Sequence, residues 1–218
     1  MEEILIGNQT WMAENLIASN FRNGDIIPEA KTWEEWIKAN EEEKPAWCYY
    51  ENNLKNKKDG KLYNWYAVCD IRGLAPMGWH IPSDDEWCKL NEFLGGDDIS
   101  GMKLKGSEGW NNNGGETVES NFNGMPSGYR NYDAGFSDFV DENGDQLINN
   151  RKGLNNGFSH YGLAGFWWSE TVDNNNEPWH IAIFCDDGYF DRMIGDKGNG
   201  FSVRCIKDEI NRKITSII

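Results

Sequence analysis

The first predicted helix lies over residues 33–41 and follows from the spacing of apolar positions. These positions recur at i, i+3 and i+4, which share one face of a helix. Thr32 and Glu35 form a capping-box sequence, in which each side chain can bond to the backbone of the other residue. Pro45 lies beyond the predicted end. The apolar face consists of Trp33, Trp36 and Ile37.

The second predicted helix begins after Ser83 and ends at the pair Gly95-Gly96. Ser83 and Glu86 form another capping box, and the acidic residues of the first turn suit the positive end of the helix dipole. A glycine directly after the last apolar position is typical of a helix C-terminus. The apolar face consists of Trp87, Leu90, Phe93 and Leu94.

The rest of the chain predicts short strands and turns. Residues 4–6 predict a first strand, residues 140–147 a hairpin, and Asp187-Gly188 a two-residue hairpin turn. Helical periodicity is absent in the second half, where short apolar segments alternate with turns rich in Gly, Asn and Asp. We therefore expect one domain of class α+β, with two helices and short antiparallel strands. The apolar segments are 102–104, 122–130, 136–140, 165–172, 180–185, 189–194 and 201–206.

Composition and charge narrow the possible partners. The chain has 218 residues and a formal net charge of −15, which repels phosphate backbones and anionic membranes, so we expect no nucleic-acid partner. No apolar run approaches the ~20 residues of a membrane helix, so we expect no membrane insertion. The first residues, 1–7, lack the basic and apolar regions of a signal peptide. This leaves a cytoplasmic location or a mature chain without its leader.

The chain has five widely spaced cysteines, and none of them form a C-x-x-C motif. This excludes a zinc ribbon and a thioredoxin-like motif. We favour small buried side chains over one or two disulfides, which stay open as the alternative. The cysteines are Cys48, Cys69, Cys88, Cys185 and Cys205.

Motifs of common enzyme and metal sites are absent from the sequence: it has no P-loop, no G-x-S-x-G and no H-E-x-x-H. Residues 141–145 imitate the opening of a calcium loop, but the glycine is misplaced and the distal Glu is missing, so a hairpin turn is favoured. We expect no cofactor, with calcium as the alternative. The acids that could gather around calcium, or lie solvated at strand edges, are Glu177, Asp186, Asp187 and Asp191.

Seven motifs follow one another along the chain in a specific order. They are IGNQTWMAENL (6–16), GKLYNWYAV (60–68), LAPMGWHIPSDDEW (74–87), GMKLK (101–105), NFNGMPSGYR (121–130), GFWWSETV (165–172) and GFSVRCIKD (200–208). Together they resemble the Fibrobacter succinogenes major paralogous domain over residues 4–208. The resemblance covers nearly the whole chain.

The resemblance implies a C-type-lectin-like fold over residues 1–208, with 209–218 as a C-terminal tail. It also implies a distant relation to the formylglycine-generating enzymes. Relatives are mostly bacterial and often secreted or lipid-anchored, and ligand binding is the role that the resemblance implies. Some bacterial and phage proteins of this fold are diversified by retroelements at exposed residues of their C-terminal strands.

The chain departs from its relatives in three places. Residues 139–157 look like an insertion that contains its own hairpin. Glu177-Pro178-Trp179 stands where a lectin calcium site has Glu-Pro-Asn, so calcium-dependent sugar binding is not carried over. The catalytic cysteine pair of the formylglycine group has no counterpart here, so that activity is not carried over either.

Residues 165–192 are crowded with aromatic, Asn and Asp residues, a composition typical of sugar- or protein-binding faces. Neighbours in a strand face opposite sides, so we expect one ring of the Trp167-Trp168 pair to be exposed. A turn at Asp187-Gly188 places Phe184 opposite Asp191, with residues 179, 181, 183 and 185 on the other, core-facing side. The candidate ligand-binding residues are Trp168, His180, Phe184, Asp186, Asp187, Tyr189 and Asp191.

We therefore expect a non-catalytic module of the cell surface that recognises a protein or a glycan through an exposed C-terminal hairpin. Two alternatives stay open. One is an enzyme of the formylglycine-generating-like group that uses Cys185 or Cys205 as a reactive thiol. The other is a structural domain of a surface fibre, which would self-associate.

Overall fold

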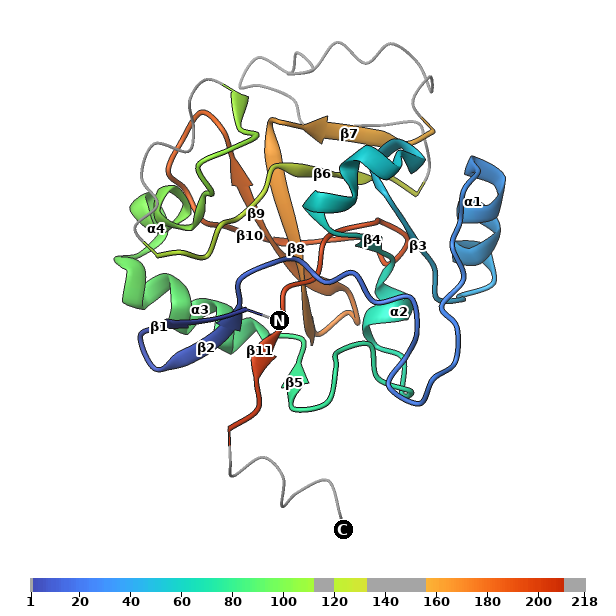
Figure 1. Ribbon diagram of the computed structural model, residues 1–218, viewed down its shortest axis with the longest axis horizontal. Helices are drawn as coiled ribbons and strands as arrows, with labels where there is room; N and C mark the ends of the chain where they lie inside the picture. Colours follow the sequence, from blue (N-terminus) through green and yellow to red (C-terminus); the bar gives the residue numbers. More distant parts are fainter. Residues whose placement is uncertain (1, 112–119, 133–155, 210–218) are drawn as a thin grey trace.

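The computed structural model describes residues 2–111, 120–132 and 156–209. The protein is of mixed α+β class, as the sequence predicts. Its centre is a five-stranded sheet in the order β10-β9-β8-β6-β7, in which only the β6–β8 pair is parallel (Figure 1). The strands are β6 (Ser127–Arg130), β7 (Phe158–Tyr161), β8 (Ala164–Val172), β9 (Pro178–Phe184) and β10 (Asp191–Ile194).

Two smaller sheets complete the β-structure. In one of them the order β1-β2-β11-β5 places a strand from the end of the chain between two strands from its first half. The prediction for residues 4–6 is confirmed by β1. The strands of these sheets are β1 (Glu3–Ile6), β2 (Gln9–Met12), β3 (Trp47–Cys48), β4 (Leu62–Tyr63), β5 (Trp79–His80) and β11 (Ile206–Lys207).

Both predicted helices are confirmed with their caps. Helix α1 (Trp33–Glu41) begins at a capping box between Thr32 and Glu35, and α3 (Asp84–Leu94) begins at one between Ser83 and Glu86. The predicted apolar faces bury Trp36 in α1 and Trp87, Leu90 and Leu94 in α3. Phe93, which was also predicted to face inward, is 64% exposed, so that part of the prediction is wrong.

Further helical segments are absent from the sequence prediction. Helix α4 (Asp97–Leu104) contains an internal glycine, Gly101, and begins at Gly96 without a side-chain cap. It therefore lacks both the apolar stripe and the capping signal that reveal a helix in a sequence. The remaining segments are short: α2 (Trp65–Val68), η1 (Tyr50–Asn52) and η2 (Leu54–Asp59). No helix in the described part of the chain is long and apolar enough to cross a membrane.

Both faces of the sheet are covered where β8 and β9 lie, and this overturns the expectation for the tryptophan pair. Trp167 and Trp168 do point to opposite sides, but each joins a different core cluster and both are 0% exposed. In β9, Ala182 packs in the cluster of Trp168, while Ile181 packs in the cluster of Trp167. Strand alternation identified the two sides correctly, but it carries no information about which side is covered.

Three strand predictions are wrong. Residues 102–104 lie in helix α4. Residues 201–206 do not form one strand: Phe201 and Ser202 make isolated bridges, and regular pairing begins only at Ile206. The β9–β10 connection is not a two-residue turn, because β9 ends at Phe184 and β10 begins at Asp191. The predictions for 136–140, 140–147 and 141–145 lie outside the described residues, as do most of the insertion 139–157 and of the tail 209–218. The division into one domain and a tail stays a prediction.

Candidate functional site

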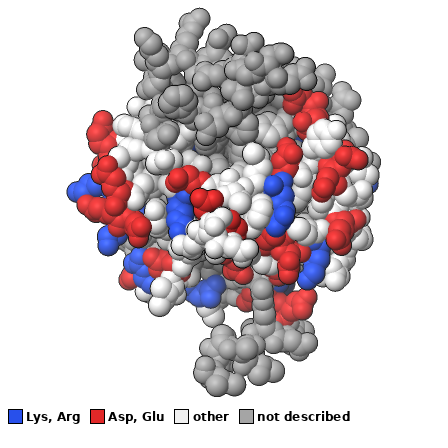
Figure 2. Space-filling model, turned by 180° about the vertical axis from the view of Figure 1, so that it is seen from behind, with Lys and Arg blue, Asp and Glu red and all other residues white. Residues whose placement is uncertain are grey.

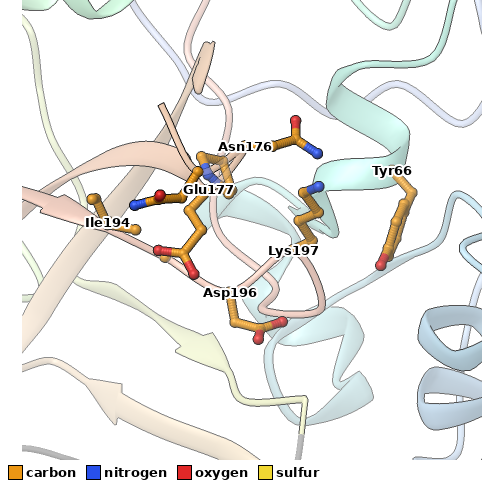
Figure 3. Close-up of a pocket in the computed structure, with 9 residues that line it drawn as sticks. Tyr66, Asn176, Glu177, Ile194, Asp196 and Lys197 are labelled. Carbon is orange, nitrogen blue, oxygen red and sulfur yellow. The ribbon is translucent and has the colours of Figure 1, made fainter. Parts of the chain in front are cut away.

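A pocket of about 490 Å³ lies at one end of the central sheet, where β9 begins and β10 ends. Its walls come from three segments: the β8–β9 turn, the end of β10 with the loop after it, and helix α2 (Figure 3). A volume of this size is typical of small-molecule sites. The lining residues are Tyr66, Asn175, Asn176, Glu177, Pro178, Ile194, Gly195, Asp196 and Lys197.

The β8–β9 turn is held in shape by the side chain of Asp173. Its Oδ1 atom accepts hydrogen bonds from the backbone N–H groups of Asn175 and Glu177 at 2.8 and 2.9 Å. These bonds lower the pKa of Asp173 by stabilising its charged form. Asn176 has a φ of 66°, a left-handed conformation that asparagine tolerates well. The turn therefore presents its amide and carboxylate side chains on a fixed backbone.

The loop after β10 is fixed to both neighbouring segments. Gly195 donates from its backbone N–H to the carbonyl of Pro178 at 2.9 Å, and the carbonyl of Lys197 accepts from Trp65 at 2.9 Å. A Cβ on Gly195 would lie 2.9 Å from His180 Nδ1, so only glycine lets the loop lie this close to the core. Asp196 accepts from the backbone N–H of Gly198 at 2.8 Å. The floor of the pocket is thus tied to the sheet and to α2.

Helix α2 supplies an aromatic wall. Asn64 caps the helix by accepting from the backbone N–H of Ala67, which orients the first turn and places Tyr66 in the pocket. Partial burial raises the pKa of Tyr66, and the carboxylates of Glu43 and Asp196 raise it further. The Lys197 ammonium lies 5.5 Å from the centre of the Trp65 ring, a favourable cation–π distance.

The pocket combines groups that suit a polar ligand. Its rim offers two amides, two carboxylates, one ammonium group and the half-buried phenol of Tyr66. Amides and phenols both donate and accept hydrogen bonds, whereas carboxylates only accept and ammonium groups only donate. The arrangement can bind a ligand rich in hydroxyl groups, and it offers charged groups for selection among such ligands.

Two predicted ligand-binding residues are buried, and the prediction that their side chains are exposed is wrong. Trp168 is fully buried, and its Nε1–H donates to the carbonyl of Tyr63 at 2.7 Å. His180 is 4% exposed, and burial lowers its pKa to about 3. The cause is the same for both: their side of the sheet packs against the cluster that contains Phe201.

The register of the β9–β10 pair also differs from the prediction. Asp191 lies opposite Ala182, two residues away from the predicted partner Phe184. A shift of two leaves each side chain on its predicted face, so Ile181, Ile183 and Cys185 are buried as expected. Phe184 is half-buried against the core.

The loop over residues 185–190 carries Asp186, Asp187 and Tyr189 and rests on α4, and Asp191 begins β10 directly after it. Asp186 is exposed, Asp187 is half-buried and Tyr189 is 50% exposed. Lys105 donates from Nζ to the carbonyl of Asp187 at 2.6 Å, which ties the loop to the end of the helix. Asp191 is half-buried. Its pKa is raised mainly by this burial and further by repulsion from the carboxylates of Asp187 and Asp97. Ligand binding by these residues stays a prediction.

All five cysteines are free, so no disulfide joins them. Cys48, Cys185 and Cys205 are buried, as expected for small apolar side chains, whereas Cys69 is exposed. Burial raises the pKa of Cys185, and it raises that of Cys205 to about 12. Neither thiol is activated by its surroundings.

The acidic residues considered as calcium ligands do not form a cluster in the described structure. Within residues 2–111, 120–132 and 156–209, no three His, Cys, Asp or Glu side chains are grouped as a metal site. Glu177 lies at the pocket, whereas Asp186 and Asp187 lie in the loop beyond the other end of β9. The four acids considered as calcium ligands are therefore not brought together.

The residues that the sequence did not reveal come from distant segments. Tyr66 lies in a short helix with no apolar period. It is far from Asn176 in the sequence, so the sequence gives no sign that both residues line the same pocket. The run Asp173-Asn-Asn-Asn176 is a typical turn signal and could have marked one wall. Lys197 and Asp196 carry no comparable signal.

The fold and this pocket define an α+β protein with an open polar site next to its central sheet. The chain belongs to the Fibrobacter succinogenes major domain family, whose model matches residues 4–207. This confirms the resemblance seen in the seven motifs. No curated protein and no solved structure matches the chain.

Proposed function

We propose that the protein is a non-catalytic ligand-binding module of C-type-lectin-like fold, and that its ligand is a glycan bound in the pocket beside Tyr66. The observation that carries this proposal is the pocket itself. It places an aromatic ring, two amides and charged groups around a volume of about 490 Å³.

The chemistry of the lining supports a glycan over an apolar ligand. Sugar hydroxyls need both donors and acceptors, and the Asn175 and Asn176 amides supply both. An aromatic ring adds rigid contact area at low entropic cost. Because Asp173 fixes the turn in advance, little backbone entropy is lost on binding.

The fold assignment rests on the family resemblance. Two capped helices followed by short antiparallel strands support it. The raised pKa values of the Cys185 and Cys205 thiols support the non-catalytic part of the proposal, since a nucleophilic cysteine needs a lowered pKa.

A binding measurement with pocket variants tests the proposal. Glycans found by array screening are titrated against the wild type, Tyr66→Ala and Asn176→Gly in a calorimeter. Asn176→Gly keeps the positive φ and removes only the amide. We expect roughly tenfold weaker binding for Tyr66→Ala and a smaller loss for Asn176→Gly.

The matched control is Tyr189→Ala, at the opposite end of β9–β10, which should leave glycan affinity unchanged. Each variant is checked for folding by circular dichroism. Unchanged affinity of a folded Tyr66→Ala protein, or the absence of any glycan from the screen, would contradict the proposal.

A protein ligand at the 185–190 loop is a second candidate function. It is favoured by the exposed ring of Tyr189 on a loop that Lys105 fixes to α4. Tyr189→Ala should then abolish capture of a protein that the Tyr66→Ala variant still captures. Retroelement diversification would vary the codons of exposed residues such as Asp186 and Tyr189. It would also leave a near-identical template repeat beside the gene.

A further inference from the structure

We infer that the pocket selects glycans that carry a protonated amine over their neutral or acidic counterparts. The inference rests on the proposed function and adds the class of sugar that the site prefers. It follows from the balance and the placement of charge around the pocket.

The lining carries more negative than positive charge. Glu177 and Asp196 each contribute a carboxylate and Lys197 one ammonium group, which leaves one net negative charge. Among the described residues, no basic side chain lies within 4.0 Å of either carboxylate. Both carboxylates are exposed at the pocket and can accept hydrogen bonds from a ligand.

A third carboxylate adds to this negative charge near the Tyr66 phenol. Glu43, just after α1, acts on the Tyr66 phenol in the same direction as Asp196. The hydroxyl of Tyr66 therefore lies in a region of negative potential. A cationic group placed beside it gains from both carboxylates.

The lysine is held apart from the carboxylates. Its ammonium group interacts with the Trp65 ring at 5.5 Å. In Figure 3 the Lys197 ammonium lies toward the Asn176 amide, and the carboxylates of Glu177 and Asp196 lie below it. The pocket thus has an acidic side that its own lysine does not fill.

The whole surface adds to this selectivity. Figure 2 shows groups of acidic side chains across one face of the molecule with basic side chains between them, and the net charge of the chain is −15. Such a field raises the local concentration of cations and repels uronic or sialic acids. A neutral sugar gains nothing from it.

An array of glycans in matched pairs tests the inference. Each pair contains a glucosamine oligomer and its N-acetylated form, which has the same backbone without the charge. Oligogalacturonates provide the acidic comparison. At low ionic strength we expect the amine forms to bind roughly fivefold more tightly than the acetylated forms, and the acidic glycans most weakly.

Variants of the charged pocket residues show whether each charge increases or decreases the preference for the amine. Glu177→Gln should bring the amine and acetylated forms to nearly equal affinity, whereas Lys197→Gln should increase the preference for the amine. Glu92→Gln, the same type of change at an exposed carboxylate of α3 outside the pocket lining, should alter neither. Salt should weaken the preference as it shortens the range of the field.

The outcomes separate the two proposals. Equal binding of both members of each pair, or tighter binding of the acetylated form, would overturn the amine preference and leave glycan binding intact. Binding of no glycan would overturn both. A Glu177→Gln variant that keeps the full preference would show that the pocket is not its source.

Discussion

The two ends of the β9–β10 strand pair are built in different ways. At the pocket end, Asp173 shapes the turn and Gly195 lets the following loop touch the core. At the other end, the 185–190 loop rests on α4 through Lys105 and a close contact at Gly101. The pocket end gathers polar side chains around a cavity, whereas the other end attaches its loop to the helix through Lys105. A fixed backbone that presents polar side chains is the combination that a small-ligand site needs.

The largest expected effect is at the α4 end. A Cβ added at Gly101 would run into the backbone carbonyl of Tyr189, which cannot move without moving the loop. We expect Gly101→Ala to destabilise the protein by about 3 kcal/mol, as a severe overpacking change does. Denaturant unfolding measures the loss. Stability within about 0.5 kcal/mol of wild type would show that the loop is not closely packed on the helix.

A similar change at the pocket end should cost less and have a different consequence. In Gly195→Ala the new methyl meets the His180 ring at 2.9 Å and Phe201 at 3.2 Å, and side chains yield more easily than backbone. We expect a loss of about 1–2 kcal/mol together with weaker glycan binding. Gly101→Ala should leave the binding constant of the folded fraction unchanged. If both variants weaken binding equally, the two ends do not act independently.

The smallest expected effect concerns pH. The pKa of Asp173 is lower in the folded protein because the turn hydrogen-bonds its carboxylate. Its contribution to stability is therefore complete above the usual aspartate pKa of ~3.9 and is lost as the pH falls through the lower folded value. We expect the backbone amide resonances of Asn175 and Glu177 to shift in this acidic range by NMR. Asp173→Asn should remove that titration, and a titration that persists would assign it to another group.

Local signals predicted the helices, and long-range packing decided the rest. Capping boxes at Thr32 and Ser83 lie within four residues, so they are visible in a sequence. Alternation assigned His180 and Ile181 to opposite faces correctly. It could not show that both faces are covered, because the covering residues, such as Phe201, come from other segments.

The pocket was hidden for the same reason. Tyr66 and the β8–β9 turn line the same pocket although they are far apart in the sequence, and a backbone hydrogen bond from Trp65 to Lys197 ties α2 to the loop after β10. No periodicity connects positions so far apart. Glu177 was recognised as a candidate ligand, but for calcium, since its neighbours in the sequence are acidic and its neighbours in space were unknown.

The position of β11 bears on how the molecule forms. This strand pairs with both β2 and β5, although it comes last in sequence order among the strands of the described residues. The hairpin of β1 and β2 therefore gains this neighbour only after residue 206 has been synthesised. Closing so long a loop is slow, so we expect a late, rate-limiting step in which β11 joins the β1–β2 hairpin.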